Sequence, residues 1–160
     1  MKHNRLSAAA FSLVEVTLAL GVATVSLLAI FALFPVSLKT NQSSIQQTVA
    51  NGLISQIAED LRAAARLPPG QVSKQFSLHP HNGGPWDPTP DYIYFTDDVQ
   101  PTGTNQSAPP ADAIYRATIT YRLPPTDTTS LADVIVSWPA AQSDLTKVAG
   151  SVETFIAINR

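Results

Sequence analysis

An unbroken apolar segment stands near the start of the chain. Residues 16–38 span 23 positions and contain no charged side chain. An α-helix rises about 1.5 Å per residue, so this segment measures roughly 35 Å, enough to cross the hydrocarbon core of a bilayer. The pattern therefore predicts a membrane-spanning helix. Pro35 lies near its end and is expected to kink or locally melt the helix, because proline removes one backbone hydrogen bond.

The helical pattern continues beyond residue 38 but becomes amphipathic. Apolar residues recur every four positions at Ile45, Val49, Leu53, Ile57 and Leu61, and the stripe is widened by Ala50, Ile54, Ala58 and Ala65. Polar residues such as Glu59 and Asp60 are assigned mostly to the opposite side. A stripe of this width is typical of a helix that covers a core, and residues 68–70 (Pro-Pro-Gly) are predicted to end it.

The rest of the chain alternates between short strand patterns and proline-rich loops. Strands are predicted at Tyr92–Phe95, Tyr115–Arg122, Asp133–Pro139 and Val152–Ile158. Residues 74–90 and 100–110 are predicted to be long loops. Three or four antiparallel strands packed against the amphipathic helix would bury both apolar faces, so the predicted fold class is α+β, with one long helix on a small antiparallel sheet.

Composition and charge argue against several classes of function for this protein. The sequence has no cysteine, which excludes disulfides, thiolate metal sites and a cysteine nucleophile. Residues 68–160 hold five Lys or Arg against nine Asp or Glu, and this acidic balance argues against a nucleic-acid partner. The chain also lacks the G-x-S-x-G, H-E-x-x-H and P-loop motifs. We therefore expect a protein that is not an enzyme and has no cofactor.

Two loop segments carry candidate metal ligands. His79 and His81 offer two imidazoles, but zinc sites need three or four placed ligands, which favours an ordinary loop. Asp97 and Asp98, followed by the side chains of residues 104–105, could hold calcium through oxygen atoms. The alternative for this acidic pair is a solvated turn, and no metal site is assigned.

The charges around the apolar segment predict its orientation. Lys2 and Arg5 precede the segment, and Lys39 alone follows it closely. By the positive-inside rule, the N-terminus stays in the cytoplasm and the rest is exported. An ordinary cleaved signal peptide is the alternative, but the small residues 8–10 lie before the apolar segment and not after it.

One acidic residue, Glu15, lies where the apolar segment begins. A carboxylate costs a few kcal/mol at bilayer depth unless it is paired or lies near the interface. Two interpretations stay open. Glu15 is either an interfacial residue stabilised by the dipole of a helix N-terminus, or a group kept for a specific partner charge.

The short basic leader, the small residues, Phe11 with Glu15 four positions later, and the long apolar helix together resemble the class III signal of type IV pilins and pseudopilins. The resemblance implies that a prepilin peptidase cuts between Ala10 and Phe11, and that Phe11 is then N-methylated. It also implies that Glu15 serves assembly by pairing with the terminal amine of a neighbouring subunit. Ala10 stands where the family usually has glycine.

The resemblance is diffuse beyond residue 67, although the order of strands also looks like minor pilins of the PilV kind and is similar in style to pilin-like cassette proteins of the Verrucomicrobia. It implies a leader at 1–10, a transmembrane and assembly helix at 11–38, an amphipathic helix at 39–67 and a β-rich headpiece at 68–160.

The function implied by the resemblance is a minor pilin or pseudopilin of a type IV pilus or a type II secretion filament. Its expected partners are prepilin peptidase, other pilins or pseudopilins and the bacterial inner membrane, with the C-terminal domain in the periplasm. The alternative is a single-pass anchored binding module that does not polymerise.

Overall fold

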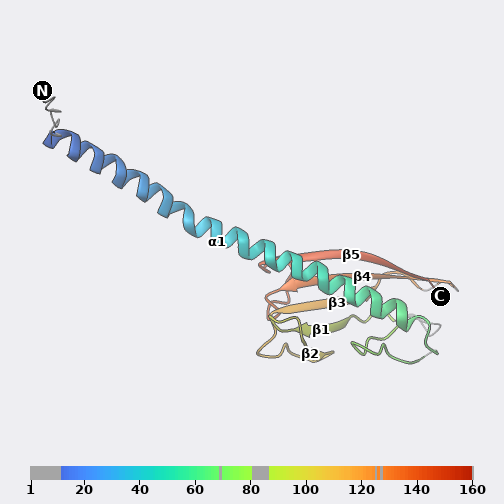
Figure 1. Cartoon of the computed structure of the whole chain (residues 1–160). Helices are drawn as coiled ribbons and strands as arrows, with labels where there is room; N and C mark the ends of the chain where they lie inside the picture. Colours follow the sequence, from blue (N-terminus) through green and yellow to red (C-terminus); the bar gives the residue numbers. More distant parts are fainter. Residues whose placement is uncertain (1–11, 69, 81–86, 125, 127, 160) are drawn as a thin grey trace, which may run out of the picture. The chain divides into compact units, whose positions relative to one another are not determined.

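The computed structural model describes residues 12–68, 70–80, 87–124, 126 and 128–159. One long helix precedes a five-stranded antiparallel sheet, which confirms the predicted α+β fold class (Figure 1). The elements are α1 (Leu13–Ala64), β1 (Asp91–Phe95), β2 (Pro101–Thr104), β3 (Tyr115–Tyr121), β4 (Thr129–Trp138) and β5 (Gly150–Asn159). The strand order in the sheet is β2-β1-β3-β4-β5.

The chain divides into two compact units, Met1–Gln42 and Ser43–Arg160, with the division inside α1. In the first unit the backbone is helical from Leu13 onward and stays helical through Pro35. The helix therefore does not melt at this proline. The kink that follows from its missing N–H stays a prediction.

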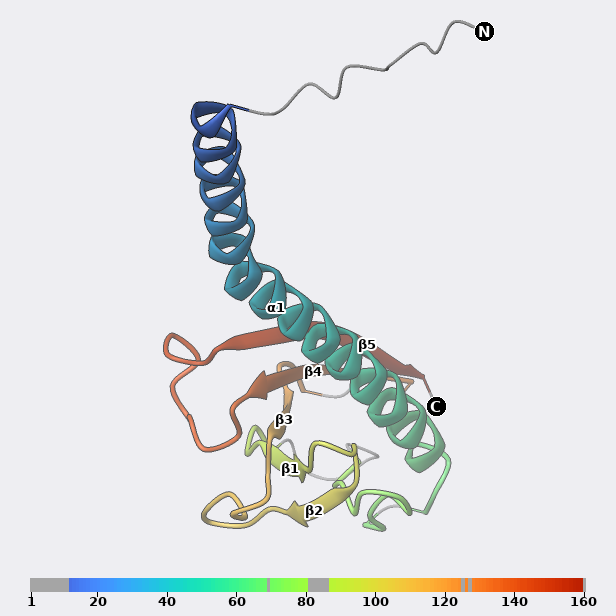
Figure 2. The same ribbon diagram turned by 60° about the vertical axis from the view of Figure 1, so that its left-hand side comes forward.

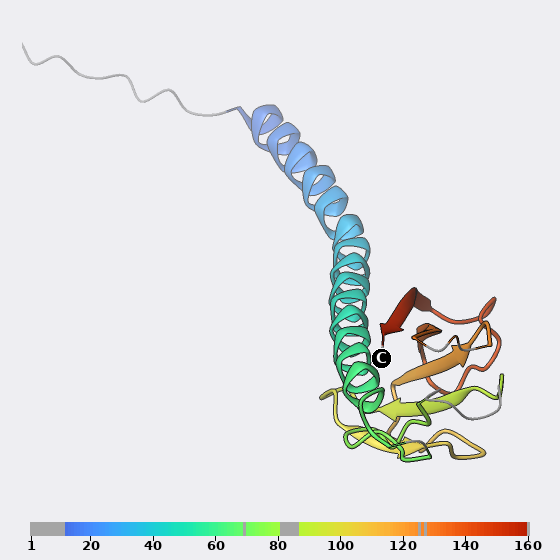
Figure 3. The same cartoon turned by 90° about the vertical axis from the view of Figure 1, so that its right-hand side faces the viewer.

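The second unit is built around the apolar stripe of α1. Leu53, Ile57 and Leu61 have no exposed surface, and they share one core cluster with the apolar side chains of the sheet. Figures 2 and 3 show this half of α1 running along one face of the sheet. The predicted stripe is wrong at its first position, because Ile45 is 56% exposed and the core begins only at Val49 and Ala50.

Side-chain alternation in the strands follows the sequence pattern. Tyr115, Ala117, Ile119 and Tyr121 of β3 are all buried in the core beneath the helix, as their spacing predicts. On β5, Ile156 and Ile158 belong to the same core, whereas Phe155 is 57% exposed on the other face. The alternation therefore fixes which sheet face is left without a helix.

Strand β2 was not expected, because the sequence pattern predicted a long loop over 100–110. It pairs antiparallel with β1, opposing Ile93 to Thr104 and Tyr94 to Gly103, with an irregularity between Tyr94 and Phe95. The strand begins at a proline and contains a glycine, so it lacks apolar alternation. It lies at the edge of the sheet, where such residues are tolerated.

Glycine is required at one position of the sheet. Trp138 of β4 lies opposite Gly150 of β5. A Cβ atom on residue 150 would come within 2.3 Å of Cζ2 of Trp138, so the indole ring occupies the space of the missing side chain. This close approach fixes the start of β5 against the end of β4.

A fragment spanning 40–160 is expected to fold and stay monomeric, because it keeps the whole core and lacks the apolar segment. In that fragment, Ile57→Asp should lower the free energy of unfolding by roughly 3–5 kcal/mol, since it places an unpaired carboxylate at a fully buried position. Ile45→Asp is the matched control on the exposed end of the stripe, and it should change stability by no more than about 0.5 kcal/mol. Urea denaturation followed by circular dichroism measures both, and equal effects would show that the stripe does not cover the sheet.

Candidate functional site

The described part of the first unit presents an apolar surface. From Leu13 to Leu38 the large apolar side chains of α1 are 50–83% exposed. By length and composition, α1 is able to cross a membrane. An exposed apolar surface of this extent on a protein marks contact with lipid or with other subunits.

The start of α1 is closed by a reciprocal pair of hydrogen bonds. The backbone N–H of Ser12 donates to Oε2 of Glu15 at 3.0 Å, and the backbone N–H of Glu15 donates to Oγ of Ser12 at 3.2 Å. This is a capping box, in which each side chain satisfies a donor that the helix leaves free. The carboxylate also lies in the first turn, where the helix dipole favours a negative charge.

The capping box gives Glu15 a local role at the start of the helix. The sequence pattern indicated such a role only through the favourable interaction of its charge with the helix dipole. The Ser-x-x-Glu spacing before the apolar segment was the signal for it. The other residues assigned to this end, Ala10 and Phe11, lie outside the described residues. Cleavage and methylation there stay predictions.

The candidate calcium ligands lie at opposite ends of one hairpin. Asp97 and Asp98 are exposed in the turn between β1 and β2, whereas Thr104 lies beside Ile93 at the far end of the pairing. Asn105 uses its side chain there to accept from the backbone N–H of Tyr92 at 2.7 Å. Within the residues that the structure describes, no three His, Asp or Glu side chains are grouped to hold a metal.

His79 is engaged by a buried carboxylate. Its Nδ1 atom lies 2.9 Å from Oδ1 of Asp91, and its backbone N–H donates to Oδ2 of the same residue at 2.9 Å. Asn105 Nδ2 donates to Oδ1 of Asp91 at 2.7 Å. Asp91 thus joins two loops to the start of β1, while His81 lies outside the described residues.

Asp60 is buried, so its assignment to the polar side of α1 is wrong. The residue is 6% exposed and accepts hydrogen bonds from the Ser73 hydroxyl, from the Gln75 backbone N–H at 3.2 Å and from the Phe76 backbone N–H at 3.1 Å. These partners lie 13–16 residues along the chain, so helical periodicity could not reveal them. The carboxylate fastens the loop after α1 to the helix.

Tyr115 and Asp144, both in the second unit, have shifted pKa values. Burial raises the pKa of the Tyr115 phenol, and the nearby Asp97 carboxylate raises it further. Hydrogen bonds from Thr146, together with one from Lys147, lower the pKa of the Asp144 carboxyl. Both shifts lead away from neutral pH, whereas general acid–base catalysis favours a pKa close to it.

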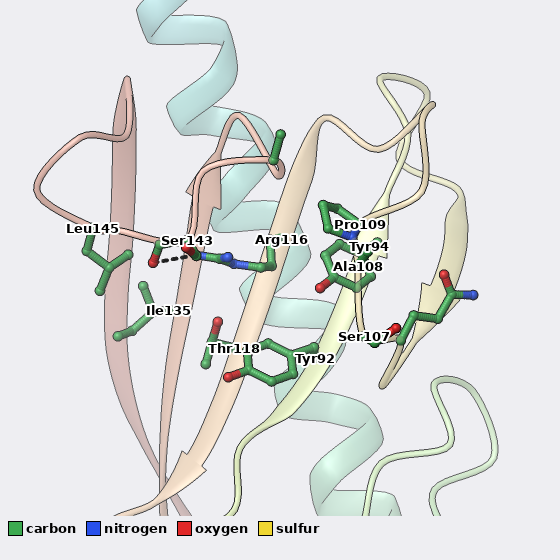
Figure 4. A pocket seen from close by; sticks show the side chains of 12 residues that line it. Tyr92, Tyr94, Ser107, Ala108, Pro109, Arg116, Thr118, Ile135, Ser143 and Leu145 are labelled. Atoms are coloured by element: carbon green, nitrogen blue, oxygen red, sulfur yellow. Dashed lines mark hydrogen bonds between the residues drawn. The ribbon is translucent and has the colours of Figure 1, made fainter.

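A pocket of about 520 Å³ opens on the sheet face that the helix does not cover (Figure 4). Its sheet side is formed by Tyr92 and Tyr94 of β1, Arg116 and Thr118 of β3, and Ile135 of β4. The loops that follow β2 and β4 supply the remaining walls. The pocket combines apolar side chains with polar ones and one cationic group, that of Arg116.

Arg116 is the functional candidate that sequence reasoning missed. It is only 7% exposed, and its Nη2 atom donates to the backbone carbonyl of Ser143 at 3.2 Å. The signal for it was the alternation in β3. When Tyr115 and Ala117 point into the core, Arg116 must lie on the opposite face, within the sheet and not in a loop.

Comparison with known proteins assigns no family. No protein-family model matches the chain, and no curated protein or solved structure matches it. Function must therefore be inferred from the apolar helix, the capping box and the sheet.

The role of Asp60 can be measured in the 40–160 fragment. Asp60→Ala should lower the free energy of unfolding by roughly 2–3 kcal/mol, because it leaves buried donors of the loop without an acceptor. Glu59→Ala removes the same charge from the adjacent, exposed position and should have an effect of less than about 0.5 kcal/mol. Similar losses in the two variants would contradict a fastening role for Asp60.

Proposed function

We propose that the chain is a structural, non-enzymatic subunit of a bacterial filament, a minor pilin or pseudopilin of a type IV pilus or a type II secretion system. It is inserted in the inner membrane with its N-terminus in the cytoplasm and its C-terminal unit in the periplasm. Prepilin peptidase then removes residues 1–10. The processed subunit joins other pilins or pseudopilins through the apolar part of α1.

The observation that carries this proposal is that two parts of α1 differ in the exposure of their apolar side chains. One part of the helix covers the sheet with Leu53, Ile57 and Leu61, and completes a closed core. The part from Leu13 to Leu38 exposes apolar side chains that no described residue covers. A helix of this kind serves the membrane before assembly and can pack against identical helices afterwards.

Cleavage before Phe11 supplies the chemistry for selective assembly. It leaves the apolar helix attached to the exported unit and creates a new terminal amine beside that helix. The carboxylate of Glu15 in one subunit can pair with the amine of the next. Removing one member of a buried ion pair costs about 3–5 kcal/mol, so pairing selects correctly placed subunits.

A second function is favoured by a different observation. The pocket around Arg116 is suited to a ligand and does not require polymerisation. The alternative is therefore a single-pass, membrane-anchored binding module of the periplasm. Such a module keeps residues 1–10, whereas a filament subunit loses them.

Processing is tested by mass spectrometry of the protein extracted from membranes. The N-terminus should be Phe11, carrying a methyl group on its amine. Ala10→Gly should be processed at least as completely as the parent, and Ala10→Arg should block processing, because the peptidase reads the residue before the cut. A protein that still begins at Met1 or Lys2 in cells with active prepilin peptidase would exclude the filament proposal.

Assembly is tested by substitutions that separate the charge of Glu15 from its cap. Glu15→Gln keeps the capping box but removes the charge, and Ser12→Ala disrupts the cap but keeps the carboxylate. Both variants should still be trimmed. Glu15→Gln should fall at least about tenfold in sheared filaments or secretion complexes, since the neighbour's amine would be buried without a partner.

Ser12→Ala should be incorporated nearly as well as the parent, because the pairing charge is still present. Quantitative immunoblots of filament and membrane fractions give both results. Normal incorporation of Glu15→Gln would show that the carboxylate serves only the helix start, and would favour the anchored module.

A further inference from the structure

The pocket on the helix-free sheet face has Arg116 at its base. Figure 4 shows the side chain extending from β3 toward Ser143, with Tyr92 and Thr118 beside it on the same face. Three neighbouring strands, β1, β3 and β4, supply these side chains, so the base of the pocket is a rigid sheet. Binding groups held on strands are placed more firmly than groups on loops.

Two of the three buried polar atoms that lack hydrogen-bond partners in the described part of the chain lie at this place. They are Nε of Arg116 and Oγ of Ser137. The two residues are paired in register between β3 and β4, so they lie side by side. Arg116 is 7% exposed and Ser137 is 1% exposed. A buried guanidinium with an unpaired N–H is unfavourable, and an added acceptor would stabilise it.

None of the described carboxylates pairs with Arg116. Oδ2 of Asp133 on β4 accepts hydrogen bonds from Arg122, including one from Nε at 2.8 Å, whereas Oδ1 of Asp133 is buried without a partner in the part of the chain that the structure describes. Asp144 pairs with Lys147 at 3.1 Å. Among the described residues, Arg116 forms no ion pair, and its guanidinium donates to a neutral backbone carbonyl, that of Ser143. The positive charge is therefore left for a ligand.

We propose that this pocket binds a carboxylate ligand. The guanidinium of Arg116 receives the carboxylate, because its planar fork matches the two oxygens of that group. Tyr92, Tyr94 and Ile135 contact the apolar part of the ligand. A carboxylate is favoured over a phosphate, because the pocket supplies one cation and a phosphate group carries a charge of about −1.5 to −2 at pH 7.

The volume of about 520 Å³ suits an organic acid or the last residues of a peptide chain. Both present the same chemistry, one carboxylate beside an apolar group. The site lies wholly in the second unit and needs no polymerisation. The proposed ligand can therefore be tested independently of the proposed filament function.

Binding is tested by isothermal titration calorimetry of the full chain in detergent micelles. The probes are benzoate, as a free acid, and an acetylated tetrapeptide that ends in phenylalanine with a free carboxylate. Their neutral counterparts are benzamide and the same peptide with a C-terminal amide. We expect each acid to bind at least about tenfold more tightly than its amide, since a charge-assisted bidentate contact is lost. The tighter of the two acids identifies the source of the ligand.

Three variants assign the binding to the pocket. Arg116→Gln should weaken binding of the acids at least about tenfold. Arg62→Gln makes the same change of net charge on an exposed position of α1 and should bind like the parent. Ala108→Phe fills the pocket from its loop wall without altering Arg116, so it should also weaken binding.

Thermal melting of each variant shows whether it is folded. If Arg116→Gln does not fold, the binding measured for Ala108→Phe tests the proposal. The proposal is overturned if neither acid binds at millimolar concentration, if acids and amides bind equally, or if folded pocket variants bind like the parent. Tighter binding of inorganic phosphate at equal ionic strength would also overturn it.

Discussion

Burial of the α1 stripe against the sheet is the interaction on which the second unit depends. Leu53, Ile57 and Leu61 are completely buried, and full burial of such a side chain contributes about 1.5–3 kcal/mol. The sheet cannot exist alone in water with an apolar face exposed, and the helix cannot keep its stripe in solvent. Asp60 reinforces the arrangement from the same helix turn, by holding the loop that leads toward the sheet.

A single helix covers only one face of a sheet. The other face is left free for side chains and loops to form a pocket. The opposite face carries mixed side chains, such as Tyr92, Arg116 and Phe155, and the loops after β2 and β4 close over part of it. Strands therefore fix the base of the site, while loops determine its walls. Arg116 is tolerated there because the loop after β4 offers the Ser143 carbonyl, although its Nε atom still lacks an acceptor among the described residues.

Local patterns predicted the helix and four of the five strands, because each depends on a periodicity within a few turns or residues. The alternation in β3 even assigned Tyr115 and Ile119 correctly to the core. The failures all depend on distant contacts. β2 is a strand only because β1 pairs with it, Asp60 is buried only because a later loop folds onto it, and Ile45 is exposed because the core begins one turn later. The pocket could not be foreseen, since two separated loops form its walls.

The carboxylate of Glu15 has a local partner in the single chain and a proposed partner in the filament, and their energies differ. Its hydrogen bond with Ser12 lies at an exposed helix end, where a cap contributes about 0.5–2 kcal/mol. A terminal amine buried without its partner costs about 3–5 kcal/mol. If the filament forms as proposed, pairing with the amine outweighs the cap, so the carboxylate can leave Ser12 when a neighbour arrives. The cap then keeps the helix start ordered until the neighbour's amine replaces Ser12 as the partner of the carboxylate. Glu15 can therefore serve as a cap first and as an assembly residue afterwards.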